Sequence, residues 1–399
     1  MEIKLSAESN MDKYPAKHHA LRVARALKID KGLIYLPGTP TRYLEDSDQT
    51  RGFRQRRYFY YLSGCAEPDT HITYDIEQDL LALWLPPIDP NSVVWNGRGS
   101  NTGEAEAKYD VDNAGYSTTL PIYFKSWLDK NSADIYILHP SQKPDLPIEY
   151  LASDSPRYNS KDLQHAIDVC RMIKDSHEIM LIKKANEIST RAHTAVLRNL
   201  RRFHNEGQIE ALFLDVCVAH GAKKQSYSII AGSGPNAAIL HYVKNDEDFG
   251  DRQLMCLDGG AEWDCYASDV TRTFPLSGRW PSSEAHNIYN LVQCMQTSAI
   301  SLLGPGKNFA SASFVSFYLA ASGLLELGIL HNGSVEEILE AGTVFAFYPH
   351  GLGHFVGLEV HDVMPEVESE AGFRTEENPY GLTVDVRQEP DRLSVWAGD

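Results

Sequence analysis

The chain of 399 residues is long enough for two or three domains, and two is the better estimate for this length. Its formal net charge is −17, from 54 acidic and 37 basic residues, which disfavours nucleic acid and anionic membranes as general partners. A hydrophobic share of 43% and a charged share of 23% are typical of a globular protein.

The six cysteines are scattered and form no CxxC pair, which favours free thiols in a reducing compartment. Residues 1–20 contain no apolar run, so no signal peptide is predicted. No segment is expected to supply the roughly 18 apolar residues that a membrane-spanning helix needs. We therefore expect a cytoplasmic protein with no membrane partner.

The first part of the chain alternates between predicted helices and strands. Apolar residues at helical spacing predict a helix over 16–28, with Pro15 at its start. Strands are predicted at 32–36, 57–62, 71–76, 80–85 and 135–138. The third and fourth of these strands form a predicted hairpin that turns through 77–79. The pattern predicts an α/β N-terminal domain with a mixed sheet over residues 1–155.

The basic run Arg54-Gln55-Arg56-Arg57 has the composition of a localisation patch. Its aromatic neighbours and the predicted strand favour a structural role instead, or pairing with nearby acidic residues.

A turn-rich segment without periodicity, 152–160, is the predicted linker to a second domain. Helices are predicted beyond it at 162–197, 210–220, 284–303 and 309–327. Ser282 or Ser283 can cap the third of these helices, and Ser334 with Glu337 forms a capping box for a further short helix. The Gly-rich turn after a strand end at 228–232 lacks the spacing and the Lys-Ser/Thr of a phosphate-binding loop, which excludes that function.

The segment 254–278 predicts two strands around a turn that contains Gly259, Gly260 and Asp264. A hairpin that turns near 263–264 would place Asp258 directly opposite Asp269, with Cβ atoms roughly 4.5–5.5 Å apart. Two facing carboxylates repel, so either a cation lies between them or one is protonated. The alternative is a register that differs by one residue and leaves one aspartate solvated.

The segment 348–363, YPHGLGHFVGLEVHDV, contains three histidines and two acidic residues. Imidazole and carboxylate are the ligands that Zn, Mn, Fe and Co prefer. His350 and His354 have the spacing of a helical zinc motif, but the three glycines oppose a helix, so loop and strand are predicted. A single histidine is usually a hydrogen-bonded core residue, whereas three within twelve positions favour a functional site.

Three segments together resemble the Xaa-Pro aminopeptidase and prolidase family, metallopeptidases with the pita-bread fold. They are GSGPNAAILHY (232–242), LDGGAEWDCYASDVTRTFP (257–275) and PHGLGHFVGLEVHD (349–362), in the order of the family. The segment FRQRRYFYYLSG (53–64) extends the resemblance into the N-terminal domain, and the likeness is greatest to the fungal branch. It implies an α+β pita-bread catalytic domain over 156–363.

The resemblance also implies the residues of the site. Asp258, Asp269 and His354 correspond to metal ligands, with Asp269 able to bridge two ions, and the implied metal is Mn. His241 and His361 correspond to catalytic histidines that steady the substrate and the oxyanion, and His350 lines the site near the leaving residue. Arg272 is expected to pair with a nearby acid.

The implied substrates are peptides with proline at the second position, from which the enzyme releases the N-terminal residue, including proline. A two-metal centre activates water for this hydrolysis and polarises the carbonyl.

The sequence departs from the family after Val363. Two further glutamate ligands, from motifs such as T-V-E-P-G and R-I-E-D, have no counterpart, and Thr383-Val384-Asp385-Val386 resembles the first motif only faintly. We therefore expect an incomplete catalytic domain, an exposed sheet edge, and a divergent acidic tail over 364–399, as in a truncated or mis-spliced product.

Two hypotheses stay open. One is a Mn-dependent Xaa-Pro exopeptidase; the other is a catalytically inactive protein that acts at most as a binding module. A homodimer is also an open alternative.

Overall fold

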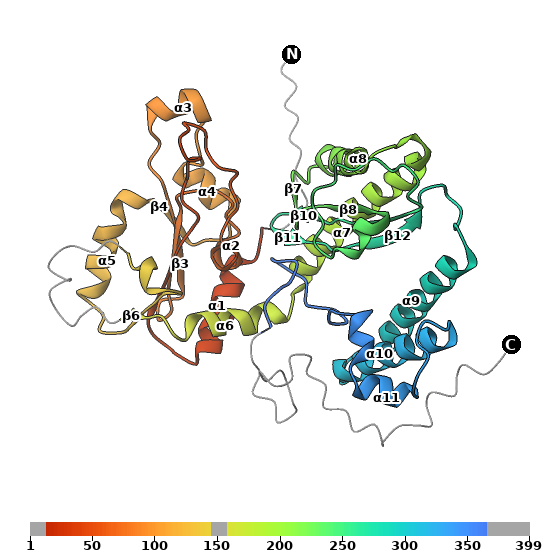
Figure 1. Ribbon diagram of the computed structural model, residues 1–399. Helices are drawn as coiled ribbons and strands as arrows, with labels where there is room; N and C mark the ends of the chain where they lie inside the picture. The colour runs from red at the N-terminus through yellow and green to blue at the C-terminus, as the bar shows by residue number, and fades with distance from the viewer. Residues whose placement is uncertain (1–12, 145–157, 365–399) are drawn as a thin grey trace, which may run out of the picture.

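The computed structural model describes residues 13–144 and 158–364, which form two parts. The N-terminal part surrounds a six-stranded sheet, and the C-terminal part surrounds two three-stranded sheets. The chain passes between the parts along α6 (Leu163–Met172) and α7 (Ser176–Asn199) (Figure 1). The boundary predicted at residue 155 lies outside the described residues.

The N-terminal sheet is mixed, as predicted. Its strands lie in the order β4-β3-β2-β1-β5-β6, with β1 antiparallel to β2, and β2 antiparallel to β3. The β3–β4, β1–β5 and β5–β6 pairs are parallel. The strands are β1 (Leu33–Pro37), β2 (His71–Asp75), β3 (Leu80–Leu85), β4 (Asn113–Tyr116), β5 (Ile135–Tyr136) and β6 (Tyr158–Asn159). The predicted hairpin 71–85 is confirmed.

Helices surround this sheet. They are α1 (Ala16–Leu27), α2 (Arg57–Ser63), α3 (Pro90–Asn96), α4 (Thr102–Lys108) and α5 (Leu120–Leu128), with short 3-10 turns η1 (Ser117–Thr119) and η2 (Pro140–Gln142). The helix predicted at 16–28 is confirmed, but the strand predicted at 57–62 is wrong, because that segment is α2. All of Phe59, Tyr60, Tyr61 and Leu62 are at most 5% exposed. A segment that is buried on all sides has no polar face. Its hydrophobic pattern therefore does not distinguish a helix from a strand.

The helix predicted over 162–197 is wrong as a single element, because it breaks between α6 and α7. Asp175 caps α7: its carboxylate accepts from the backbone N–H of Glu178, and the Glu178 carboxylate accepts from the backbone N–H of Asp175. This reciprocal pair satisfies two N–H groups at the helix start and therefore fixes a new helix at that point.

The C-terminal part places two small sheets beside α7 and α8 (Glu206–Ala219). One sheet has the order β12-β9-β8 and the other β11-β10-β7. The strands are β7 (Lys224–Gln225), β8 (Ile230–Ser233), β9 (Leu254–Asp258), β10 (Ala261–Trp263), β11 (Tyr266–Ala267) and β12 (Thr271–Pro275). Short 3-10 turns lie at η4 (Leu200–Arg202) and η5 (Gly234–Ala238). Buried side chains of α7, α8 and the sheets pack into one core.

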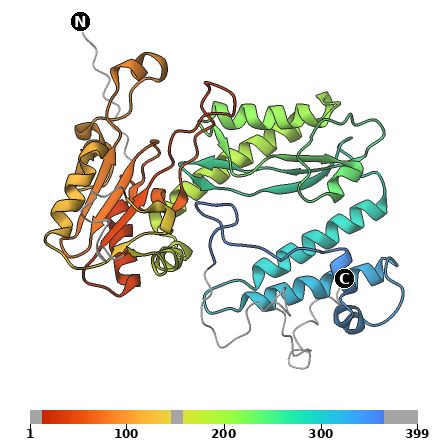
Figure 2. The ribbon, with the colours of Figure 1, turned by 60° about the vertical axis from the view of Figure 1, so that its left-hand side comes forward.

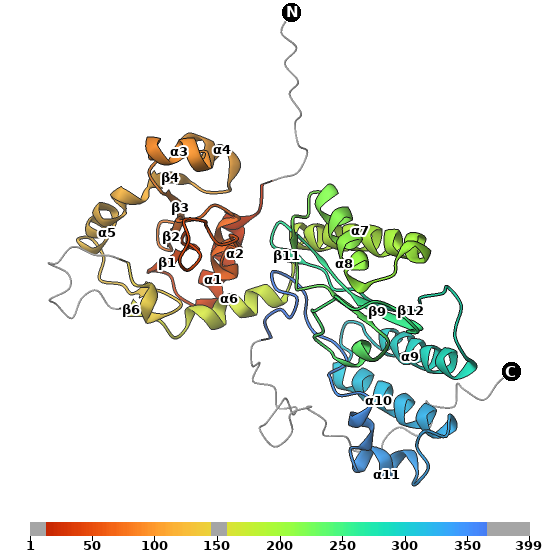
Figure 3. The same cartoon turned by 45° about the horizontal axis from the view of Figure 1, so that its top comes forward.

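Three helices follow the sheets: α9 (Ser283–Ser301), α10 (Phe309–Glu326) and α11 (Val335–Glu340), with the 3-10 turn η6 (Thr343–Ala346). In Figures 2 and 3 they lie on the side of the sheets opposite α7 and α8. The predicted cap at Ser282 and the capping box of Ser334 with Glu337 are confirmed.

One helix of the described part, α10, is long and apolar enough to cross a membrane by length and composition, contrary to the prediction. Core helices of soluble proteins meet the same criterion. Phe317, Ala320 and Ala321 on α10 pack against Ile338 and Val344 in a small core of their own.

Candidate metal and active site

The two predicted carboxylate ligands come from β9 and from the segment just before β12, but they do not face each other. Asp258 pairs with Thr271 across the β9–β12 ladder. The turn lies at Asp264 and Cys265, which have φ of 45° and 67°, one residue later than predicted. That shift moves the cross-strand partner of Asp258 by two residues. The predicted direct opposition of Asp258 and Asp269 is therefore wrong.

The close approach of the two chain segments depends on Gly260. A Cβ atom at this position would lie 1.8 Å from the carbonyl oxygen of Ser268 and 3.2 Å from the backbone nitrogen of Asp269. Only glycine permits this contact. Asp269 is therefore held beside the β9–β10 connection, which carries Asp258 at its start.

Tyr227 joins the two carboxylates. Its hydroxyl is within hydrogen-bonding contact of Asp258 Oδ1 and lies 2.9 Å from Asp269 Oδ1. Burial, together with the charge of Asp269, raises the pKa of Asp258. The two aspartates are thus linked by a tyrosine that the sequence analysis missed. No local pattern distinguishes Tyr227 from an ordinary core aromatic residue.

His354 contacts the other carboxylate oxygen of Asp269. Its Nε2 atom lies 3.0 Å from Asp269 Oδ2, and its Nδ1 atom lies 2.9 Å from the carbonyl oxygen of Phe355. The contact with Asp269 raises the pKa of His354 and lowers the pKa of Asp269. The ring of His361 lies 4.3 Å from that of His354 between centroids. One donor atom each from Asp269, His354 and His361 lie within 4.8 Å of one another.

The remaining predicted histidines are less central. His241 lies close enough to Asp258 for its charge to lower the pKa of that carboxyl, which opposes the larger effect of burial. His350 is exposed, with Nδ1 2.8 Å from the carbonyl oxygen of Gly351 and its ring against Tyr348, and it is not a member of the compact group. Residues 349–364 contain no strand, so the predicted strand there is wrong.

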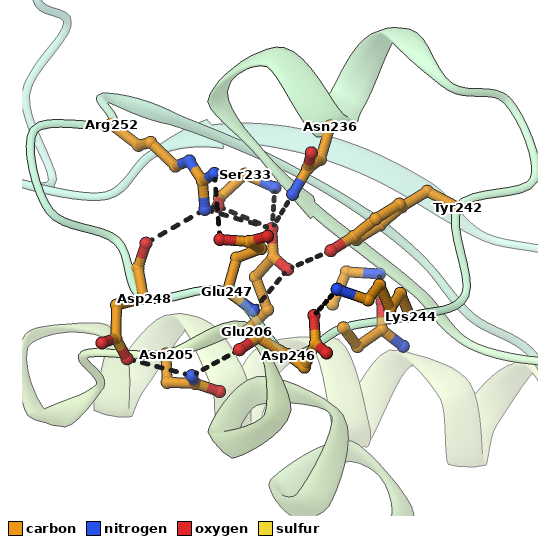
Figure 4. A network of polar contacts seen from close by, with 12 residues as sticks. Asn205, Glu206, Ser233, Asn236, Tyr242, Lys244, Asp246, Glu247, Asp248 and Arg252 are labelled. Atoms are coloured by element: carbon orange, nitrogen blue, oxygen red, sulfur yellow. Dashed lines mark hydrogen bonds and ion pairs between the residues drawn. The ribbon is translucent and has the colours of Figure 1, made fainter.

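A buried carboxylate organises the segment that carries His241 (Figure 4). Glu206, at the start of α8 and fully buried, accepts hydrogen bonds from Ser233, Asn236 and Tyr242 and from the backbone N–H of Glu247. Burial opposes ionisation, but these hydrogen bonds outweigh it and lower the pKa of Glu206. Five donors on one carboxylate explain how an irregular segment keeps one conformation.

The predicted pairing of the basic run with acids is confirmed. Arg54 binds Glu359 through two nitrogens at 2.9 and 2.7 Å, and Arg57 contacts both Glu359 and the buried Glu262. Arg272 does not pair with an acid as predicted. Its guanidinium donates to the carbonyl oxygen of Thr271 and forms no ion pair with a described residue.

The donor set fits a divalent transition-metal ion. Two carboxylates held together by one hydroxyl repel each other, and a cation relieves that repulsion. His354 directs Nδ1 at a backbone carbonyl, the arrangement that fixes the tautomer of a metal-binding histidine, and it turns Nε2 toward Asp269, the neighbouring candidate ligand. The compact group of described residues contains no glutamate. The acidic tail, including Glu366, Glu368 and Asp385, lies outside the described residues.

Comparison with known proteins identifies the family of this chain. The model of metallopeptidase family M24 matches residues 180–384, and that of the aminopeptidase P N-terminal domain matches 18–136. A probable Xaa-Pro aminopeptidase of Pyrenophora tritici-repentis is 55% identical over 362 residues, which are 90% of this chain and 54% of the relative. One of Aspergillus clavatus is 51% identical over 91% of this chain and 73% of the relative. The chain thus spans 54% of the length of the Pyrenophora tritici-repentis relative. It spans 39% of the length of a second probable Xaa-Pro aminopeptidase, from Pyrenophora teres.

Solved structures are similar over both parts. Zn-substituted Escherichia coli aminopeptidase P in complex with product has a TM-score of 0.77 at 26% identity, over 88% of this chain and 83% of the other. Pseudomonas aeruginosa aminopeptidase PepP has a TM-score of 0.78 at 28% identity, over 89% and 82%. These likenesses confirm the expected N-terminal mixed-sheet domain and pita-bread domain. The chain therefore belongs to metallopeptidase family M24, among the Xaa-Pro aminopeptidases.

Proposed function

We propose that this chain is a manganese-dependent Xaa-Pro aminopeptidase. It would hydrolyse the first peptide bond of peptides with proline at the second position and release the N-terminal residue. The observation that carries the proposal is the run of contacts from Asp258 through Tyr227 to Asp269 and from Asp269 to His354. Asp269, His354 and His361 form the compact donor group, and Asp258 lies beside it across the Tyr227 hydroxyl.

Asp258, Asp269 and His354 would hold the metal, which supplies an activated water and polarises the substrate carbonyl. The chain's own residues do the rest. His361 belongs to the compact group, with its ring edge-on to that of His354, and His241 lies close to Asp258. Both can donate hydrogen bonds to substrate oxygen as negative charge develops. Exposed His350 would line the side where the residue after the scissile bond leaves.

A second candidate function is metal and peptide binding without turnover. The observation that favours it is the donor group itself, which contains no glutamate among the described residues. The reaction needs a base to accept a proton from the attacking water, and a carboxylate placed beside that water commonly serves. Without one, the site would bind its ligands and cleave slowly.

Purified residues 1–399 separate these candidates. Manganese binding is measured by calorimetry, and cleavage is measured on a peptide with proline at position two and on the same peptide with alanine there. Proline-dependent release that requires manganese and disappears in Asp269→Asn supports the aminopeptidase. If the wild-type chain binds manganese but cleaves neither peptide, and Asp269→Asn abolishes the binding, the result supports the binding module. Absence of both overturns both candidates.

We also propose that the protein is cytoplasmic. All six cysteines are free thiols, which is consistent with a reducing compartment. Fractionation of cells that express a tagged chain tests this, and recovery with secreted protein would contradict it. The homodimer remains a proposal that light scattering of the purified chain decides.

A further inference from the structure

The segment 354–362, here called the histidine segment, carries two site histidines but no helix or strand. Few backbone hydrogen bonds hold it. Gly357 donates to Glu359 and Asp362 donates to Phe355 within the segment, at 3.1 and 2.9 Å, and Ala267 on β11 donates to Gly357 at 2.7 Å. Side chains must therefore supply most of what fixes its conformation.

The first side-chain anchor is Asp362, which directly follows His361. Its side chain is 1% exposed, and each carboxylate oxygen binds one cation: Arg171 Nη2 at 2.6 Å and Lys174 Nζ at 2.8 Å. Arg171 is itself buried and lies 4.9 Å over the ring of Tyr58. A buried carboxylate held by two cations has little freedom to move, and it fixes the backbone on one side of His361.

The second anchor is Glu359, two residues before His361. Arg54 contacts it through two nitrogens, and Arg57 Nε lies 3.2 Å from its Oε1 atom. Arg57 also contacts the buried Glu262 on β10. Glu359 and Asp362 therefore lie on either side of His361 in the chain. The cations that bind them are themselves held in place, by burial or by contact with Glu262.

The four cations come from outside the region that the M24 model matches, which begins at residue 180. Arg54 and Arg57 lie in the region matched by the aminopeptidase P N-terminal domain, and Arg171 and Lys174 lie between the two matched regions. We propose that these four residues are positioning residues: two cations from the N-terminal part and two from the connection between the parts hold the histidine segment, and thereby His354 and His361, in the geometry that binds metal. The proposal rests on the function proposed above for this site.

A simpler alternative is that these ion pairs only hold the two parts together. Their loss would then lower the stability of the whole chain without a particular effect on the histidine segment. The two alternatives differ in where the chain loosens and in whether metal affinity changes, and both quantities can be measured without peptide cleavage.

The test compares Arg171→Met, Arg171→Lys and a control, Arg98→Met, in residues 1–399. Arg98 pairs with Glu104 inside the N-terminal part, so its loss removes an exposed arginine–carboxylate pair without touching the segment. Hydrogen exchange of the peptide that covers 354–362 is measured without metal, and the dissociation constant for manganese is measured by calorimetry.

We expect Arg171→Met to accelerate exchange in the histidine segment while the strands β1 to β3 remain protected. Manganese affinity should fall roughly 10–100-fold, the usual effect of losing a partner that orients metal ligands. Arg171→Lys keeps the cation, so its exchange rate and its manganese affinity should both stay close to those of the wild type. Arg98→Met should change neither the exchange of the histidine segment nor the manganese affinity. If Arg171→Met does not fold, Glu359→Gln provides the same comparison at a less buried anchor.

Unchanged exchange in the histidine segment, or an equal acceleration throughout the chain, would overturn the inference. A wild-type chain that neither binds manganese nor cleaves peptide would overturn the proposed function alone, because hydrogen exchange still decides whether the cations hold the segment. If the wild-type chain cleaves peptide, Arg171→Met should lower kcat more than it raises KM, since misplaced histidines affect the reacting geometry more than substrate capture.

Discussion

The hydroxyl of Tyr242 donates a 2.7 Å hydrogen bond to the buried carboxylate of Glu206, 36 residues earlier in the chain. This contact joins the residue next to His241 to the first turn of α8. The same carboxylate accepts from Ser233 and Asn236, so the whole irregular segment depends on one acid. Local order near the site therefore comes from a distant helix start.

Glu206→Ala should lower the free energy of unfolding by about 3 kcal/mol or more, because several buried donors lose a charged acceptor. Tyr242→Phe should cost only about 1 kcal/mol, because it removes one hydrogen bond and leaves the acid its other donors. Urea unfolding of both variants and the wild type measures the difference. Equal costs for the two variants would contradict the central role of Glu206.

The acid sensitivity of the chain should depend on Asp175. Burial opposes its ionisation, but hydrogen bonds from His19 and from the backbone of Glu178 outweigh it, so the pKa is lower in the folded chain than in the unfolded one, where it is about 3.9. The folded state therefore binds fewer protons. The resulting stability is present above about pH 4 and is lost as the pH falls below it.

Asp175→Asn removes this charge but keeps a good helix cap at α7. We expect the variant to be about 1–3 kcal/mol less stable than the wild type at pH 6, and this gap should narrow steadily as the pH falls below about 4. Denaturant unfolding across this range measures the gap. Asp89→Asn, at the exposed cap of α3, is the control and should show a much smaller pH-dependent difference. A gap for Asp175→Asn that stays constant with pH would exclude the depressed pKa as its cause.

The sequence predicted most elements whose polar and apolar faces differ. The hairpin of β2 and β3, the cap of α9 and the capping box of Ser334 with Glu337 all follow local rules. The predictions were wrong where local sequence rules do not specify the structure. The run in α2 is apolar on every side, and the turn at Asp264 and Cys265 places a cysteine at positive φ, which turn preferences do not favour. The break before α7 was predictable, since Asp175 and Glu178 have the capping-box spacing.

The candidate site was predictable in its ligand types but not in its supports. Asp258, Asp269 and His354 stood out because carboxylates and histidines gather beside glycines in two short segments. The contacts that hold them join residues far apart in the chain: Arg171 and Asp362 are separated by 191 positions, and Arg54 and Glu359 by 305. No periodicity or local motif encodes such pairs, because each partner alone resembles an ordinary charged residue.

Gly260→Ala should prevent the approach of Asp269 to the β9–β10 connection. The added Cβ would overlap the carbonyl oxygen of Ser268, and backbone atoms cannot move aside as a flexible side chain can. We expect a loss of at least about 3 kcal/mol in unfolding free energy, beyond the usual cost of overpacking. Gly52→Ala, where a Cβ meets nothing within 4 Å, is the control and should be nearly neutral. A stable Gly260→Ala chain with unchanged manganese affinity would refute this account of how Asp269 is placed.

Tyr227→Phe tests whether the tyrosine substitutes for a cation between the carboxylates. Without its hydroxyl, Asp258 and Asp269 lose a shared hydrogen-bond partner, and their mutual repulsion is left without that compensation. The metal-free variant should therefore unfold about 1 kcal/mol more easily than the wild type. Manganese removes the same repulsion, so it should raise the melting temperature of the variant by more than it raises that of the wild type. Thermal unfolding with and without saturating manganese measures both shifts, and Tyr43→Phe, at an exposed tyrosine, controls for the loss of a hydroxyl. Equal manganese-induced shifts in Tyr227→Phe and the wild type would mean that the hydroxyl does not take the place of the ion.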